Sequence, residues 1–164
     1  SSKTPKVEII AGTRNVWALE LFDQDMVGDP SYGQKMNDLV FESGVRVLTK
    51  DFNANTVTFY LKGNKRRINW LMDRLQANYT GADIRVEKMA MVSAIGSDMK
   101  VPGLLTSAAS ALSDAGVNIL SVHQAMRQVD MMFIVADQDY AAAVKALHSG
   151  LIESNSDWQA VQSA

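Results

Sequence analysis

The sequence contains no cysteine, no long apolar run and no excess of charge of one sign. The absence of cysteine excludes disulfide bonds, thiol nucleophiles and cysteine-based metal sites. The net charge of −2 gives no electrostatic reason to expect binding to nucleic acid or to an anionic membrane surface. Because no apolar run approaches the ~20 residues of a membrane-spanning helix and no signal peptide is visible, we expect a cytoplasmic protein with neither a nucleic-acid nor a membrane partner.

The sequence has ample material for a core, and it repeats itself. A length of 164 residues is enough for one ordinary domain or two small ones, and because 47% of the residues are hydrophobic, a core can form. Residues 43–47 (Ser-Gly-Val-Arg-Val) resemble residues 115–119 (Ala-Gly-Val-Asn-Ile), and Pro30 and Pro102 lie at the same offset as the glycines of these segments. A shared offset across loop, helix and turn indicates an internal duplication.

The first copy predicts the element order βαββαβ. Its apolar residues run or alternate where strands are expected and recur at helical spacing in between. Gly44 is a natural helix stop, because glycine adopts the left-handed conformation without strain. We expect strands at residues 16–22, 45–52, 56–61 and 84–86, and helices with the apolar stripes Tyr32, Met36, Leu39, Val40 and Ile68, Leu71, Met72, Leu75.

The second copy follows the same order but lacks its last strand. We expect strands at residues 89–95, 117–125 and 130–136, and helices at residues 104–115 and 140–151. Residues 153–164 contain no convincing strand, so we expect them to form a C-terminal tail.

An additional apolar strand at residues 7–11 precedes the first copy. An unpaired strand and an open sheet edge are both costly, so we expect this strand to complete the sheet of the second copy. The predicted fold is α+β, with two ferredoxin-like βαββαβ domains, antiparallel sheets and helices on one face, and with the first domain inserted into the second. The expected domains are residues 15–87, and residues 7–14 together with 88–152, followed by the tail at 153–164.

Two segments of the second copy resemble a known family. The segment 96–103, with Gly-Ser-Asp-Met at its start and Pro-Gly at its end, and the segment 115–119 are similar to the C-terminal ACT domain of aspartokinases. The resemblance covers the chain from Val7 to about Ile152. It implies that both copies are ACT domains and that the first is inserted into the second.

The resemblance also implies a regulatory function. Aspartokinases phosphorylate aspartate with ATP and magnesium in an N-terminal kinase domain, which we expect to be absent from this chain, so no cofactor is expected here. Their ACT domains bind lysine or threonine as effectors, report to the kinase domain of the same protein and associate side by side, which implies a homodimer. Because the sequence does not begin with Met, we expect a fragment of such a protein.

The loop that opens the first helix of the second copy is the candidate effector site. Free backbone N–H groups and the positive end of the helix dipole suit the carboxylate of an amino acid. Gly103 removes a side chain where a ligand would approach, and Asn118 offers a donor and an acceptor. The alternative is that Pro102 and Gly103 only form the turn and that Asn118 only satisfies backbone groups. With the resemblance included, the candidate effector-binding residues are Met99, Pro102, Gly103, Leu104, Asn118, Ile119 and Gln124 in the second copy, and Gly28, Asp29 and Ser31 in the first.

The first copy departs from the family pattern. Residues 28–31 (Gly-Asp-Pro-Ser) replace an Asp-x-Pro-Gly loop, Arg46 stands where an asparagine is usual, and Phe52 stands at the position equivalent to Gln124. These changes argue against lysine or threonine sensing by the first copy. Such an atypical pattern is expected of aspartokinases dedicated to a specialised pathway, such as ectoine synthesis.

Other functions fit the sequence less well. His123 and His148 lie in different predicted elements, without a serine or carboxylate at catalytic spacing, so we expect no catalytic residue and no metal site. RNA-recognition domains share the βαββαβ order and stack bases on aromatic residues, but their glycine–aromatic motif and basic surface are missing. Two alternatives stay open, namely a structural dimerisation module that has lost effector binding and a separate regulatory subunit.

Overall fold

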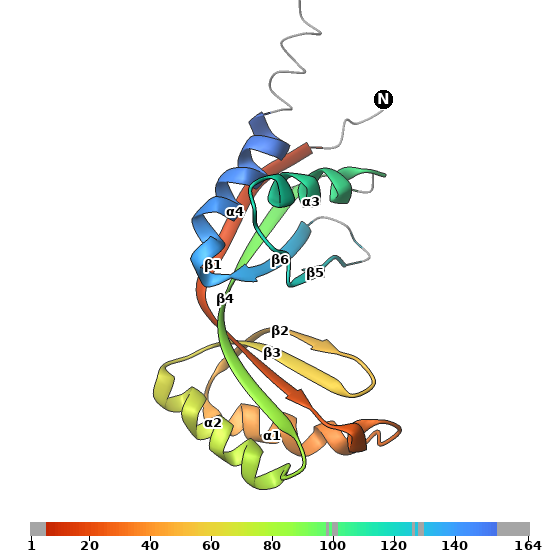
Figure 1. Ribbon diagram of the computed structural model, residues 1–164, viewed down its shortest axis with the longest axis vertical. Helices are drawn as coiled ribbons and strands as arrows, with labels where there is room; N and C mark the ends of the chain where they lie inside the picture. Colours follow the sequence, from red (N-terminus) through yellow and green to blue (C-terminus); the bar gives the residue numbers. More distant parts are fainter. Residues whose placement is uncertain (1–5, 98, 100–101, 126, 128–129, 154–164) are drawn as a thin grey trace, which may run out of the picture. The chain divides into compact units, whose positions relative to one another are not determined.

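The computed structural model describes residues 6–97, 99, 102–125, 127 and 130–153. The helices and strands are shown in Figure 1. They are β1 (Lys6–Phe22), α1 (Tyr32–Ser43), β2 (Arg46–Phe52), β3 (Thr56–Lys62), α2 (Lys65–Asn78), β4 (Asp83–Ser97), α3 (Leu104–Asp114), β5 (Ser121–His123), β6 (Asp130–Ala136) and α4 (Tyr140–Leu147). The described residues also contain three short elements, which are the 3₁₀ turns Gln24–Met26 and Asp137–Asp139 and the π-helix His148–Glu153.

The chain divides into two compact units. The inserted unit is Asn15–Lys88, and the outer unit consists of the described residues of 1–14 and 89–164. The sequence-based boundary lay one residue earlier, between residues 87 and 88. Most of the predicted tail, residues 154–164, lies outside the described residues.

The strands β1 and β4 correct one prediction. The sequence indicated separate strands at 7–11 and 16–22, and at 84–86 and 89–95, but each pair forms one continuous strand. The separation between 86 and 89 was wrong because Glu87 and Lys88 are not turn-forming residues, so nothing interrupts the extended backbone. In β1 the backbone remains a strand through Asn15, although this residue has a φ of 55°.

The inserted unit has the sheet order β2-β3-β1-β4. Residues Trp17–Phe22 of β1 pair antiparallel with Leu61–Thr56 of β3, and β3 pairs antiparallel with β2. The helices α1 and α2 pack beside each other on the sheet. Their predicted apolar stripes supply the core together with alternating residues of β1 and β3. The fully buried members are Leu19, Leu21, Met36, Leu61, Leu71 and Leu75.

The outer unit has the sheet order β1-β4-β6-β5. The beginning of β1 belongs to it, because Val7 is only 2% exposed within its core and Ile10 packs against the same core. Arg14 donates a hydrogen bond from Nη2 to Oδ2 of Asp137, over 3.0 Å. These contacts confirm that the first residues complete the second domain, as the count of strands indicated.

The strand predicted at residues 117–125 is much shorter in the structure. Only Ser121–His123 form β5, which pairs antiparallel with Ile134–Met132 of β6. The N–H of Val117 donates to the carbonyl of Leu112 over 3.0 Å, so Val117 is held by the helix end and cannot begin a strand. Gly116, with a φ of 74°, ends the helix as predicted, because this turn requires a left-handed residue.

The last predicted helix is divided in two. The α-helix α4 ends at Leu147, and the chain continues as the π-helix His148–Glu153. Within the part of the chain that the structure describes, no helix is both long and apolar enough to cross a membrane.

Replacement of Gly12 and of Gly33 by alanine should have opposite effects on stability. A Cβ at Gly12 would lie 2.5 Å from Cε2 of Tyr140, whose ring also lies 5.5 Å from the Arg14 guanidinium. Gly12→Ala should displace this ring and lower the free energy of unfolding by about 1–2 kcal/mol. As a matched control, a Cβ at Gly33 in α1 meets nothing within 4 Å, so Gly33→Ala should raise stability by about 0.5 kcal/mol. Urea unfolding followed by circular dichroism measures both, and equal effects would contradict the packing at Gly12.

Candidate functional site

Among the described residues of the outer unit, no side chain caps the N-terminus of α3. Gly103 precedes the helix with a φ of 92° and offers no side-chain acceptor to the N–H groups of the first turn. The backbone bond from Ser107 N–H to the Gly103 carbonyl, 2.9 Å long, begins the helical pattern. The free N–H groups before it, and the positive end of the helix dipole, favour an anion such as a carboxylate.

The glycine itself is explained by conformation. A Cβ on Gly103 would meet nothing within 4 Å, so no close approach in the chain requires its absence. A φ of 92° does require glycine, because other residues are strained there. The turn-forming explanation therefore accounts for Gly103 without a ligand.

The surroundings of Asn118 favour the explanation that this loop binds a ligand. Its side chain is exposed on the segment between α3 and β5, and it makes no hydrogen bond within the described part of the chain. It therefore does not satisfy backbone groups there, and its amide donor and acceptor remain available to a ligand.

The remaining predicted residues of the outer unit fall into two groups. Met99, only 2% exposed, lies in the hydrophobic core, and Leu104 and Ile119 pack against that core. Pro102 and Gln124 are exposed. Three of the predicted residues thus belong to or border the same core, while Pro102 and Gln124 lie at the surface. Their part in effector binding stays a prediction.

The corresponding loop of the inserted unit is held by its own side chains. Gly28 has a φ of 77°. Oδ1 of Asp29 accepts hydrogen bonds from Oγ of Ser31, over 2.7 Å, and from its N–H, over 2.9 Å. These donors hold the pKa of the Asp29 carboxyl below its usual value. Asp29 and Ser31 are therefore brought together, as partners of each other at the start of α1.

A neighbouring cluster was missed by sequence reasoning. Asp23, only 8% exposed, accepts a hydrogen bond from the N–H of Asp25 over 2.9 Å, and the hydroxyl of Tyr32 donates to the same carboxylate. The hydroxyl of Tyr79 donates to the carbonyl of Tyr32 over 2.9 Å. The available signal was an acidic residue directly after an apolar strand, but no spacing pattern of the sequence links it to Tyr32 or Tyr79.

The cluster changes the acidity of its tyrosines. Burial raises the pKa of Tyr32, and its hydrogen bond to Asp23 raises it further. Burial also raises the pKa of Tyr79. Both phenols are therefore held in the neutral form, in which Tyr32 can donate to Asp23. This arrangement fixes the loop of the inserted unit without any ligand.

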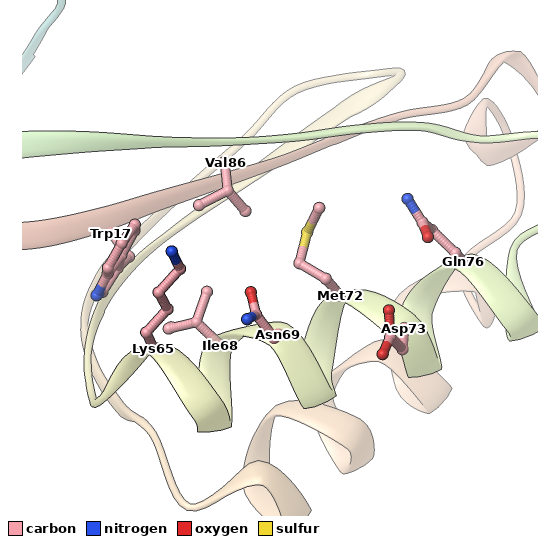
Figure 2. A pocket seen from close by; sticks show the side chains of 8 residues that line it. All are labelled: Trp17, Lys65, Ile68, Asn69, Met72, Asp73, Gln76 and Val86. Atoms are coloured by element: carbon pink, nitrogen blue, oxygen red, sulfur yellow. The ribbon is translucent and has the colours of Figure 1, made fainter.

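A groove of about 400 Å³ lies elsewhere in the inserted unit, along α2 (Figure 2). Its walls come from one side of α2 and from the strands β1 and β4. The lining residues are Trp17, Lys65, Ile68, Asn69, Met72, Asp73, Gln76 and Val86.

Comparison with known proteins agrees with this geometry. Residues 92–151 match the family model described as ACT domain. With two ferredoxin-like units, one inserted into the other, the chain has the architecture of a pair of ACT domains. Over nearly its whole length it is similar to the regulatory region of aspartokinases.

The relatives support this assignment. The chain is 41% identical over 163 residues to the aspartate kinase Ask_Ect of Stutzerimonas stutzeri (strain A1501), which covers 99% of this chain and 34% of that protein. The chain thus spans about a third of the length of this curated relative.

Solved structures share the fold. The regulatory subunit of aspartate kinase from Thermus flavus has a TM-score of 0.76 at 18% identity, covering 88% of this chain and 98% of that one. The E. coli aspartokinase III in complex with lysine and aspartate has a TM-score of 0.74 at 20% identity, covering 93% of this chain and 35% of that one.

Because of the cluster formed by Asp23, Tyr32 and Tyr79, we expect the protein to lose stability at high pH. Because the pKa of Tyr32 is raised in the folded state, its stabilising effect is complete below the ordinary value of 10.0 and is lost as the pH rises above it. Tyr32→Phe should lower the free energy of unfolding at neutral pH by about 2 kcal/mol, since the Asp23 carboxylate loses a donor. The variant should also lose less stability than the parent between neutral pH and strongly alkaline pH. Urea unfolding across this range measures both effects, and parallel pH profiles would contradict the arrangement.

Proposed function

We propose that the chain senses an amino acid through its outer unit and thereby regulates the ATP-dependent phosphorylation of aspartate by a kinase domain of the same protein. The observation that carries this proposal is the combination of two features of the described residues, an α3 N-terminus without a side-chain cap and an Asn118 amide without a hydrogen-bond partner. A carboxylate on the helix N–H groups and an ammonium near the Asn118 oxygen use both halves of an amino acid.

Lysine and threonine are the first effectors to test. The E. coli aspartokinase III structure contains lysine and aspartate, which supports an amino-acid ligand. ATP and magnesium serve the kinase domain in this proposal, and no cofactor is assigned to the described residues. A cytoplasmic location also remains a proposal, consistent with a pathway of amino-acid biosynthesis.

The inserted unit is less suited to sensing. Asp29 is engaged by Ser31, and Asp23 by Tyr32, so the carboxylates of this loop already have donors within the chain. Arg46 and Phe52 lie at the two ends of β2. We propose that this unit contributes mainly to assembly.

The edge strand β2 supports a homodimer. It lies at the end of the sheet order, and its residues Val47 and Phe52 are 43% and 65% exposed. Phe41, near the end of α1, is 86% exposed. An open edge with exposed apolar side chains is a template for pairing with a second copy. The alternatives are a dimerisation module without an effector, and a separate regulatory subunit, as the Thermus flavus protein is titled.

Effector binding can be tested directly. Isothermal titration with lysine, threonine and a pool of other amino acids should reveal at least one ligand, and Asn118→Ala should weaken its binding about tenfold by removing a hydrogen bond to a charged group. Arg46→Ala, at the equivalent position of the first copy, should leave the affinity unchanged. An unchanged affinity in Asn118→Ala would mean that the site lies elsewhere, and no response to any amino acid would favour the dimerisation module.

Assembly gives a separate prediction. Sedimentation velocity should show a concentration-dependent dimer, which Phe52→Lys should dissociate by placing a charge on the apolar edge. Val122→Lys, in the short edge strand β5 of the outer unit, introduces the same charge on a residue that is 41% exposed and should leave the dimer intact. A parent chain that stays monomeric at every concentration would refute the proposed interface.

A further inference from the structure

The groove along α2 has polar side chains in a regular row. Lys65, Asn69 and Asp73 follow one another at intervals of four residues, so they lie on the same side of the helix. Gln76 extends the row at its far end (Figure 2). The helix rises 1.5 Å per residue, which separates the Cα atoms of Lys65 and Asp73 by about 12 Å.

The two ends of the groove carry opposite charge. Lys65 and the indole of Trp17 lie together at one end, and Asp73 and Gln76 at the other (Figure 2). Nζ of Lys88 lies 5.1 Å from the centroid of the Trp17 ring and adds a second positive charge at the first end. The groove is therefore cationic at the Trp17 end and anionic at the Asp73 end.

The middle of the groove is apolar. Ile68, Met72 and Val86 lie between the charged ends, and Ile68 is buried in the core beneath them. Trp17 is held in place because its Nε1–H donates to the carbonyl of Gly63 over 3.2 Å. A ligand would thus contact an ordered aromatic wall and an aliphatic surface between two charges.

The polar side chains of the groove have no partner among the residues that the structure describes. Among the described residues, neither Lys65, Asn69, Asp73 nor Gln76 makes a hydrogen bond or an ion pair. In particular, Lys65 and Asp73 do not neutralise each other, because two helical turns separate them. Both charges therefore remain available to a ligand of opposite polarity.

We propose that this groove binds an elongated zwitterion, with its carboxylate at Lys65, its ammonium at Asp73 and a short methylene chain over Met72 and Val86. An extended six-carbon ω-amino acid spans about 8 Å from its nitrogen to its carboxylate oxygens, and the flexible side chains of Lys65 and Asp73 cover the remaining length. The amides of Asn69 and Gln76 supply donors and acceptors along the path. The groove shares no residue with the α3 terminus or Asn118, so it forms a second site, independent of the effector site proposed above.

The first test uses ε-aminocaproate, a zwitterion with five methylenes, on the whole chain. Isothermal titration should show saturable binding in the millimolar range, as expected for solvent-exposed charges. Caproate and hexylamine, which each lack one charge, should bind roughly fivefold more weakly. The NMR signal of the Trp17 indole N–H should shift with the same saturation curve, with Trp17→Phe identifying that signal.

Variants of the two ends give matched controls. Lys65→Gln and Asp73→Asn should each weaken ε-aminocaproate roughly fivefold. The same changes on exposed helical positions of the outer unit, Lys145→Gln and Asp114→Asn, should have no effect. Because all four side chains are exposed, circular dichroism should show that every variant remains folded.

Reversing one charge makes the sharpest test. Lys65→Glu combined with Lys88→Gln removes both cations of the first end and leaves two anionic ends, so the groove should then prefer hexamethylenediamine to ε-aminocaproate. No saturable binding to the parent chain would overturn the proposal, and so would equal binding of caproate and ε-aminocaproate. An unchanged preference in this double variant would also overturn it. None of these results would affect amino-acid binding at Asn118, which titration with threonine measures separately. Lysine carries the same terminal charges as ε-aminocaproate, so its binding is assigned to one site or the other by comparing Asn118→Ala with Asp73→Asn.

Discussion

The antiparallel strand at the start of the chain is the constraint on which the rest of the structure depends. The second βαββα sequence has no final strand of its own, and the first residues of β1 supply it. Val7 enters the core of the outer unit, Gly12 leaves room for the Tyr140 ring, and Arg14 pairs with Asp137. Because the strand must be paired, the chain forms one domain inside the other.

The duplicated loop has different chemistry in the two copies. In the outer unit, Gly103 gives α3 no side-chain cap, and Asn118 has no partner in the described chain. In the inserted unit, Ser31 binds Asp29, and Tyr32 binds Asp23. One copy therefore presents free donors and acceptors at its surface, whereas the other satisfies them internally. This contrast supports effector sensing at the α3 loop of the outer unit and not at the corresponding loop of the inserted unit.

Much of the fold was accessible from periodicity and turn chemistry. Gly44 and Gly116 ended the predicted helices, because both positions require the left-handed conformation. The extent of the strands was less accessible. Val117 lies in an apolar run typical of a strand, but its N–H is bound to the end of α3. Local hydrophobicity cannot reveal such a competing hydrogen bond.

The candidate site was predictable only in part. The motif around Gly103 and Asn118 lies within short segments of the sequence, so spacing and resemblance indicated it. Met99 is apolar, which is typical of a core residue, but it lies in a loop motif outside the predicted helices and strands, so no periodicity placed it in the core.

By itself, the sequence determined the duplication, the insertion of the first copy and the glycine helix stops, because these depend on local backbone preference and on the need to pair every strand. Only the tertiary structure decided that Asp23 contacts Tyr32, that Tyr79 supports them, and that Trp17 and Val86 enclose a groove with α2. These contacts join residues far apart in the chain, and their chemistry arises only when packing of the core brings the separate elements together.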